Sequence, residues 1–261
     1  MPDTLSFSLR GKVIVVCGGS GLLGRSLVST IAGAEAKLVI TSRDRKKVES
    51  MAAAECAAGQ TVYAEQAELE SEPSVLAMRD RVLAAHGRID GVVYNAASRP
   101  MTGWNVPLSQ WEASMATNAT GFFATVRALG DAMAASGGGS LVNISSMYGL
   151  VGFNPFLYEG TNMGTSPDYF FHKAGMLNMT RWMATHYGKQ KVRVNAVTPG
   201  GIYNPDKPQP AEFLGRFARM TALARMADAR EICGAVIFLL SDASTYVTGA
   251  TIPVDGGYTC R

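Results

Sequence analysis

A tyrosine and a lysine four residues apart form the part of this chain best suited to acid–base chemistry. On a helix, Tyr169 and Lys173 would lie one turn apart on the same face. A free tyrosine titrates at about pH 10, and a neighbouring ammonium group stabilises its phenolate and brings its pKa closer to neutrality. Ser146, just after the apolar run 140–144, could hold a substrate oxygen. The set predicts general acid–base catalysis, although Tyr-x-x-x-Lys alone also occurs by chance on amphipathic helices.

A glycine-rich turn near the start of the chain could bind a dinucleotide. Gly18, Gly21 and Gly24 separate the apolar run 12–17 from a helical pattern. Glycines at such a turn let the backbone approach a pyrophosphate, and the helix N-terminus supplies amide donors. Because the turn stands between an expected strand and an expected helix, we expect a cofactor site rather than only a tight connection.

The end of the second apolar run bears on the choice of cofactor. Ser42 and Arg43 stand where the adenosine ribose would lie. An acidic residue there would accept a hydrogen bond from the ribose 2′-hydroxyl, whereas an arginine suits a 2′-phosphate. This favours NADP as cofactor, with NAD also possible; the alternative is that Arg43 is a solvated charge at a helix start.

These residues need a scaffold that brings strand ends together. Short Val/Ile/Leu runs alternate with helical patterns, which is typical of a parallel sheet with helices on both faces. We expect an α/β fold: a Rossmann-like doubly wound sheet of about seven strands, in a single domain over residues 1–261. The expected strands are 12–17, 37–41, 61–64, 90–94, 140–144, 192–197 and 250–254.

Two stretches interrupt this alternation. Residues 153–168 precede the Tyr169 helix, and residues 202–225 follow the sixth expected strand. Both leave the sheet at the carboxyl end of a strand, where open parallel sheets bind their ligands. We therefore interpret them as walls or lids of a substrate site rather than as surface loops.

The overall composition excludes several classes of function. Hydrophobic residues make up 47% and charged residues 17% of the chain, which indicates a globular protein with a sizeable core. A net charge of +3 is too weak to predict a nucleic-acid or membrane partner. The four cysteines have no metal-ligand spacing, so no metal is expected. Neither a signal peptide nor a transmembrane run is recognisable, so we expect a cytoplasmic protein.

Taken together, these motifs resemble those of the short-chain dehydrogenase/reductase family, in its single-domain branch. The resemblance implies an NAD(P)-dependent oxidoreductase that transfers a hydride between nicotinamide and a carbonyl or secondary alcohol. It spans nearly the whole chain. The matching pieces are the glycine turn, Asn95-Ala-Ala97, Asn118, Asn143-Ile-Ser-Ser146, Tyr169-x-x-x-Lys173, Arg193-Val-Asn-Ala-Val-Thr-Pro-Gly200 and the tail Thr248–Gly257.

The resemblance also implies a role for each matching residue. Tyr169 is the general acid/base, Lys173 lowers its pKa and binds the nicotinamide ribose, Ser146 orients the substrate oxygen, and Asn118 supports a proton relay. Ser145 is the less favoured serine because the family uses the second of the pair. The implied cofactor-binding residues are Gly18, Ser20, Gly21, Leu23, Gly24, Ser42, Arg43, Glu68, Leu69, Asn95, Ala96, Tyr169, Lys173, Pro199, Gly200 and Ile202.

The chain departs from the family pattern in places that leave the catalytic groups intact. Leu22 stands where the middle glycine of the turn is usual, and Ala97 replaces a glycine. Part of the 153–168 stretch, Tyr158-Glu-Gly-Thr-Asn-Met163, is similar to the same region of bacterial family members associated with surface-sugar biosynthesis.

The substrate is expected to be small and hydroxylated, such as a keto sugar, polyol or sugar acid. The 153–168 loop carries many hydrogen-bonding side chains, and such groups discriminate strongly for substrate hydroxyls; they include Asn154, Tyr158, Glu159, Thr161, Asn162 and Thr165. Arg99 and Lys207 could add a cationic edge for a carboxylate or phosphate, or be surface charges, which is the preferred interpretation of Lys207. The alternatives are a 3-oxoacyl thioester reductase, a non-redox enzyme on the same scaffold, and a catalytically silent binding protein.

The family resemblance further implies self-association. The apolar run 235–240 and the last expected strand could pack across two-fold axes as a homotetramer or homodimer, or could be ordinary core.

Overall fold

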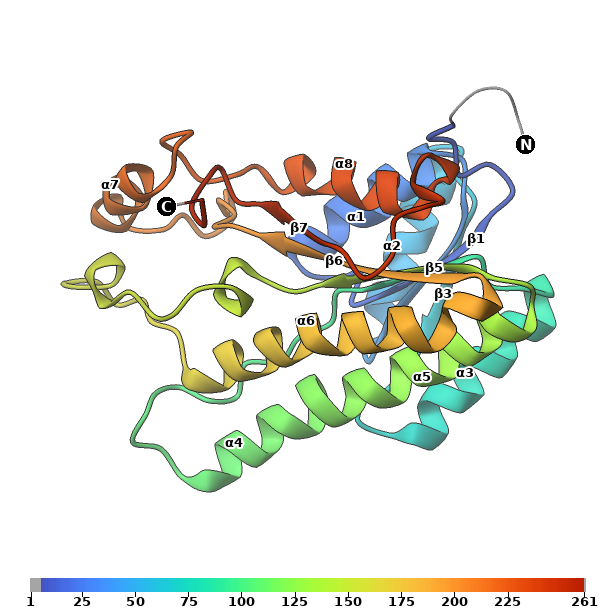
Figure 1. Cartoon of the computed structure of the whole chain (residues 1–261), viewed down its shortest axis with the longest axis horizontal. Coiled ribbons are helices and arrows are strands. Elements are labelled where there is room, and N and C mark those ends of the chain that lie inside the picture. Colours follow the sequence, from blue (N-terminus) through green and yellow to red (C-terminus); the bar gives the residue numbers. More distant parts are fainter. Residues whose placement is uncertain (1–5, 261) are drawn as a thin grey trace.

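Seven parallel strands form the centre of the molecule. The structure, a computed structural model, describes residues 6–260. The strands are hydrogen-bonded in the order β3-β2-β1-β4-β5-β6-β7 (Figure 1). The Rossmann-like doubly wound sheet expected from the sequence is therefore confirmed. The strands are β1 Val13–Cys17, β2 Lys37–Ser42, β3 Val62–Gln66, β4 Gly91–Tyr94, β5 Gly139–Ile144, β6 Val192–Pro199 and β7 Thr251–Val254.

Helices cover both faces of this sheet, which explains why its central strands are apolar throughout. All five residues of β1 and all four of β4 are buried, as expected for strands enclosed on both sides. One face carries α1 (Leu22–Gly33), α2 (Arg45–Ala57) and α8 (Ala229–Leu240) (Figure 1). The other face carries α3 (Glu72–His86), α4 (Leu108–Met115), α5 (Phe122–Ala135) and α6 (Pro167–Tyr187).

The strand order reverses direction at β1. The chain moves outward from β1 through β2 to β3, then returns so that β4 pairs with the other side of β1. In a doubly wound sheet, a crevice opens at the carboxyl ends of the two strands that flank this reversal. The glycine turn after β1 and the Asn95 segment after β4 therefore meet at one edge.

The helical stretch before β5 is interrupted by a π-helical segment, Ala116–Gly121, between α4 and α5. A Cβ on Gly121 would lie 2.6 Å from the carbonyl oxygen of Leu69, so the glycine allows the helix to approach the segment after β3. Single π-helical turns are frequent at functional sites. This one carries Asn118.

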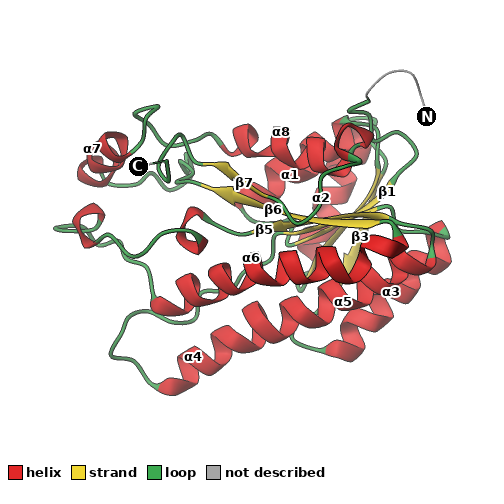
Figure 2. Ribbon diagram, viewed as in Figure 1, coloured by secondary structure: helices red, strands yellow, loops and turns green. Residues whose placement is uncertain are grey.

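The two interrupting stretches pack on each other beyond the carboxyl edge of the sheet. Residues 153–168 include a short 3-10 turn, Pro155–Leu157, and residues 202–225 include α7, Ala211–Met220. Figure 2 shows that loops make up much of this end of the molecule. Leu157 of the first stretch and Phe213 and Phe217 of the second meet in a small apolar cluster, which residues outside both stretches complete: Met147, Tyr148 and Tyr258.

Two further findings concern the described residues 6–260. None of their helices combines the length and apolarity needed to cross a bilayer. No group of three or more His, Cys, Asp or Glu side chains among them is arranged to hold a metal ion.

Candidate active site

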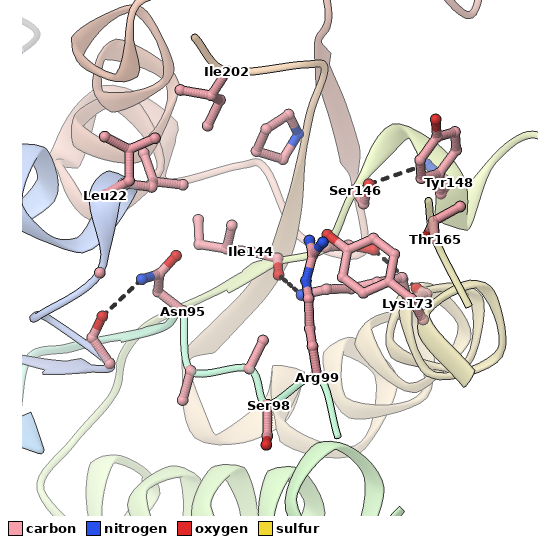
Figure 3. A pocket seen from close by; sticks show the side chains of 18 of the residues that line it. Leu22, Asn95, Ser98, Arg99, Ile144, Ser146, Tyr148, Thr165, Lys173 and Ile202 are labelled. Carbon is pink, nitrogen blue, oxygen red and sulfur yellow. Dashed lines mark hydrogen bonds between the residues drawn. The ribbon is translucent and has the colours of Figure 1, made fainter. Parts of the chain in front are cut away.

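A single cleft contains most of the residues singled out in the sequence. It runs from the glycine turn after β1, past the ends of β4 and β5, to the 153–168 loop. Figure 3 shows Leu22 and Asn95 on one side of it, and Ser146, Tyr148 and Thr165 on another. Both interrupting stretches contribute to its lining, as expected of walls or lids.

Lys173 lies beneath Tyr169 at the carboxyl end of β5. Its ammonium nitrogen is 5.7 Å from the centroid of the Tyr169 ring and donates to the carbonyl oxygen of Ile144 at 2.7 Å. The side chain is only 3% exposed. Burial lowers the pKa of Lys173, although the nearby Tyr169 phenol acts in the opposite direction. The cation is therefore fixed by the fold and directed at the tyrosine.

The surroundings of Tyr169 favour its phenolate. Burial acts to raise the pKa of Tyr169, but the charges of Lys173 and Arg99 and the hydroxyl of Ser146 outweigh it, so the pKa lies below its ordinary value. Ser146 also caps the short turn after β5, where its oxygen accepts from the amide of Tyr148 at 3.2 Å. This is the arrangement that a tyrosine acid/base needs.

His172 is the obvious competitor for the acid/base role, since it lies between the two residues of the pair. Its ring packs edge-on against Tyr169 with centroids 5.3 Å apart, and the side chain is 5% exposed. Burial, followed by the charge of Lys173, lowers its pKa to about 3. Neither ring nitrogen has a hydrogen-bond partner among the described residues. His172 does not line the cleft, so it is part of the packing behind Tyr169.

The two serines after β5 have different surroundings. The Ser145 hydroxyl donates to the carbonyl oxygen of Lys173 at 2.8 Å, so it joins the strand end to α6. Ser146 remains the serine available to a substrate.

Asn118 lies behind the cleft rather than in its lining. Its side chain accepts from the amide of Ser98 at 2.9 Å and donates to the Ser98 carbonyl at 2.8 Å. It also donates to Ser114, whose hydroxyl contacts the buried carboxylate of Asp168. The chain of contacts ends one residue before Tyr169, so Asn118 positions both the Ser98–Arg99 segment and the start of α6.

The glycine turn is built to leave space for a bound group. A Cβ on Gly24 would lie 2.4 Å from the carbonyl oxygen of Gly18, so this glycine lets α1 pack against the turn. Gly18 has φ +84°, a conformation that favours glycine. A Cβ on Gly21, in contrast, would meet no described atom within 4 Å. Gly21 faces the cleft at the N-terminus of α1, which fits a dinucleotide diphosphate.

Asn95 holds this turn from the neighbouring strand. Its amide nitrogen donates to the carbonyl oxygen of Gly18 at 2.8 Å. The remaining predicted residues that line the cleft are Ser20, Leu23, Ser42, Arg43, Leu69, Ala96, Pro199, Gly200 and Ile202.

One predicted cofactor residue lies elsewhere. Glu68 is exposed and borders a separate hollow beside α2 and α3. The chain turns after β3, where the amide of Ser71 donates to the carbonyl oxygen of Glu68 at 3.0 Å. Ala67 and Leu69 are buried and line the cleft, which turns Glu68 away from it. The Glu68 side chain therefore lies outside the cleft lining, and its role in cofactor binding stays a prediction.

The 153–168 loop is less polar toward the cleft than the sequence suggested. Of its hydrogen-bonding side chains, only Tyr158 and Thr165 line the cleft. Asn154 instead caps the 3-10 turn, accepting from the amide of Phe156 at 3.2 Å. The Thr161 hydroxyl donates to the Tyr158 carbonyl at 2.8 Å. Short polar side chains often satisfy local backbone groups in this way, which sequence alone does not reveal.

Several further lining residues lie outside the predicted catalytic and cofactor-binding set. Tyr148 and Tyr158 come from different loops, and their hydroxyl oxygens are 2.5 Å apart. Gln209 donates to the Ile202 carbonyl at 2.9 Å and thereby holds the second loop over the cleft. The others include Thr41, Ala67, Glu70, Ser98, Thr117, Met163, Asn204, Phe213, Phe217 and Met226.

Comparisons with known proteins agree with this geometry. A family model described as enoyl-(acyl carrier protein) reductase matches residues 20–259. The chain is 32% identical to cis-4-hydroxycyclohexanecarboxylate dehydrogenase of Sinomonas cyclohexanicum, covering 95% of this chain and 96% of the relative. It is also 32% identical to NADP-dependent mannitol dehydrogenase of Hypocrea jecorina, covering 98% and 95%.

A solved structure is similar along the whole length. Gluconate 5-dehydrogenase from Burkholderia cenocepacia, in complex with NADP and tartrate, has a TM-score of 0.88 and 27% identity, covering 98% of both chains. The family match, the fold and the Ser146–Tyr169–Lys173 arrangement lead to one conclusion. The chain belongs to the short-chain dehydrogenase/reductase family and is an oxidoreductase that uses a nicotinamide dinucleotide.

Proposed function

We propose that this enzyme interconverts a carbonyl and a secondary alcohol on a small, hydroxylated substrate. The observation that carries the proposal is the position of Tyr169 and Ser146 in a cleft whose lining includes the polar residues Tyr158 and Thr165. These groups can hydrogen-bond to substrate hydroxyls around the reacting carbon. Relatives that act on mannitol and on a hydroxycyclohexane carboxylate, and a structural neighbour that binds tartrate, support this class.

The chain's own residues supply the proton chemistry of the reaction. The nicotinamide ring, when bound, donates or accepts the hydride. In reduction, the Tyr169 hydroxyl gives its proton to the carbonyl oxygen while Ser146 donates a hydrogen bond to the same oxygen. Lys173 stabilises the resulting phenolate. In oxidation, the phenolate takes the proton from the alcohol.

We assign NADP as the preferred cofactor on the basis of Arg43. Its side chain is 67% exposed and lines the cleft beside Ser42, where a 2′-phosphate can be reached. Its nearest acidic partner is Glu70, at 3.6 Å, which leaves the pair loose enough to exchange for a phosphate.

A 3-oxoacyl thioester is the second candidate substrate. Apolar side chains from the second loop and α7 also line the cleft, including Phe213, Phe217 and Met226. The matching family model bears the description of an acyl carrier protein reductase. An acyl chain could pack along this wall.

One experiment decides between the two candidates. Initial rates with NADPH are measured in parallel on keto sugars and on short 3-oxoacyl thioesters, and with NADP on the matching alditols. We expect efficient turnover of hydroxylated compounds. Turnover of the thioesters alone would refute the proposal, and absence of cofactor turnover with every substrate would favour a non-redox or catalytically silent protein.

We further propose that the enzyme works in the cytoplasm as a homo-oligomer, either a dimer or a tetramer. The thiols of Cys17, Cys56, Cys233 and Cys260 are all free, which suits a reducing compartment.

A further inference from the structure

Arg99 is a cation of the cleft to which the reaction outlined above assigns no contact with the substrate. It follows β4 in the segment that begins with Asn95, and it lines the cleft. Its guanidinium carbon lies 4.3 Å from the centroid of the Tyr169 ring. Figure 3 shows the side chain extending from its loop toward Ile144 and Ser146 rather than away from the cleft. The positive group therefore stands beside the position where the reacting oxygen must bind.

No acidic side chain among residues 6–260 forms an ion pair with Arg99. Among the described residues, Arg99 takes part in no salt bridge, although eleven others are formed elsewhere on the molecule. The one acidic residue in the described lining of the cleft is Glu70, which pairs with Arg43 at the adenosine end. Lys173 adds a second positive charge near Tyr169. The substrate end of the cleft thus carries two cations and no described anion.

The cofactor's phosphates have another binding place. The diphosphate fits the Gly21 turn after β1, and a 2′-phosphate fits Arg43 after β2. In Figure 3, Leu22 of the glycine turn and Arg99 lie on different sides of the cleft, and Arg99 shares its side with Ser146 and Lys173. The anion that Arg99 is placed to bind therefore belongs to the substrate.

We propose that Arg99 binds a carboxylate of the substrate, so that the enzyme acts on short hydroxylated oxo acids and the corresponding hydroxy acids. The guanidinium presents a planar pair of donors that matches a carboxylate in a bidentate contact. Because it lies over the ring of the tyrosine that handles the reacting oxygen, the carboxylate must be attached close to the reacting carbon. This inference rests on the proposed function and narrows its substrate class to acids.

The test compares acids with neutral molecules of the same length. Values of kcat/KM with NADP are measured for aldonic acids and for the matching alditols, using wild type, Arg99→Ala, Arg99→Lys and Lys207→Ala. Lys207 is the matched control, because it is an exposed cation of the second loop outside the cleft lining. Wild type should prefer the acids by roughly ten- to a hundredfold, the usual gain from charge-assisted hydrogen bonds.

The variants should separate anion binding from other roles of Arg99. In Arg99→Ala the preference should vanish, mainly through a higher KM for the acids. Arg99→Lys should keep part of it, and Lys207→Ala should keep all of it. Arg99 also affects the pKa of the Tyr169 phenol. The ratio of kcat/KM for aldonic acids to kcat/KM for alditols is therefore compared at each pH, because an effect on proton transfer changes both values equally and cancels in the ratio.

Some outcomes would overturn the proposal while leaving the proposed function intact. These are equal wild-type turnover of alditols and aldonic acids, an equal loss of both in Arg99→Ala, and a clear preference for sugar phosphates over aldonic acids. A measurement on wild type alone covers the case in which the variants misfold. With an alditol substrate, malonate should inhibit competitively and malonamide should not; equal inhibition by both would refute the proposal. If no hydroxylated compound is turned over, the proposed function itself fails.

Discussion

The chemistry depends on one side chain, Tyr169, because Ser146, Lys173 and Arg99 are all arranged around its phenol. We predict that Tyr169→Phe lowers kcat by about 10²–10⁴-fold, the usual contribution of a positioned acid or base. Affinity for the cofactor, measured by fluorescence titration, should stay close to that of wild type. His172→Gln is the control, since His172 contacts the same ring from outside the cleft. If Tyr169→Phe kept a large fraction of activity, or His172→Gln lost as much, the assignment would be wrong.

The same phenol should govern the dependence of oxidation on pH. The reaction requires the phenolate, so kcat/KM should rise with pH to a plateau, with a midpoint below the ordinary value for tyrosine because the pKa of Tyr169 is lowered. Burial opposes that lowering, whereas the Lys173 charge and the Ser146 hydroxyl produce it. In Ser146→Ala the midpoint should therefore move to higher pH. A midpoint that moved lower, or did not move, would contradict the role given to Ser146.

Arg43 provides the test of cofactor choice. A charge-assisted hydrogen bond contributes about 1.5–3 kcal/mol, so wild type should prefer NADPH over NADH by roughly one to two decades in kcat/KM. Arg43→Ala should remove most of this preference, because it weakens the binding of NADPH and leaves the binding of NADH unchanged. Glu70→Gln should strengthen the binding of NADPH slightly, because it frees Arg43 from its acidic partner. A wild-type preference for NADH would refute the assignment.

At the scale of single residues, sequence reasoning succeeded where backbone geometry leaves little freedom. Tyr169 and Lys173 share a face of α6, and the turn glycines, Ser42 and Arg43 follow strand ends that all meet at one edge. It did not foresee that the Glu68 side chain lies outside the cleft lining, because the chain turns directly after β3. It also could not foresee the buried contact of Ser114 with Asp168, which joins residues far apart in the chain.

At the scale of elements, the β1–α1 turn offers a matched pair of glycines. Gly24→Ala places a methyl group 2.4 Å from the Gly18 carbonyl oxygen, which is backbone and cannot move away cheaply. We expect it to destabilise the protein by about 1–3 kcal/mol and to weaken cofactor binding as the turn shifts. Gly21→Ala projects into open space, so it should change stability little and reduce cofactor affinity by occupying the diphosphate site.

Thermal unfolding of both variants without cofactor, together with cofactor titration, checks this pair. Cofactor binding by Gly21→Ala as strong as wild type would show that the diphosphate lies elsewhere. A melting temperature for Gly24→Ala equal to that of wild type would show that α1 does not pack on the turn as described.

The sequence predicted where strands and helices occur better than it predicted irregularities within a helix. The expected strands and helices correspond to observed ones because their apolar runs are buried against both helical layers. The π-helical segment Ala116–Gly121 was not foreseen, since it depends on the approach of Gly121 to Leu69 from another element.

At the scale of the whole molecule, the alternation of strands and helices predicted the layered sheet, whereas the surfaces it leaves exposed were not predicted. The run 235–240, expected to mediate association, is partly core, since Val236, Leu239 and Leu240 are buried. Large apolar side chains are instead exposed on α6. Phe171 and Trp182 are 60% and 58% exposed, and they lie about three turns apart on one face. Aromatic residues in such positions are common in protein–protein interfaces.

We therefore predict that the α6 surface around Phe171 and Trp182 mediates the self-association proposed above. Light scattering should show a dimer or tetramer of wild type at micromolar concentration. Trp182→Asp should shift the protein toward a smaller species, because it places a charge in a surface that must become dry. Tyr63→Thr on the edge strand β3 is the control, since it removes a 42% exposed aromatic residue from another element. A monomeric wild type would refute the proposed self-association. An unchanged oligomer in Trp182→Asp would show that the interface lies elsewhere. The half-buried part of 235–240 and β7 would then be the next surface to substitute.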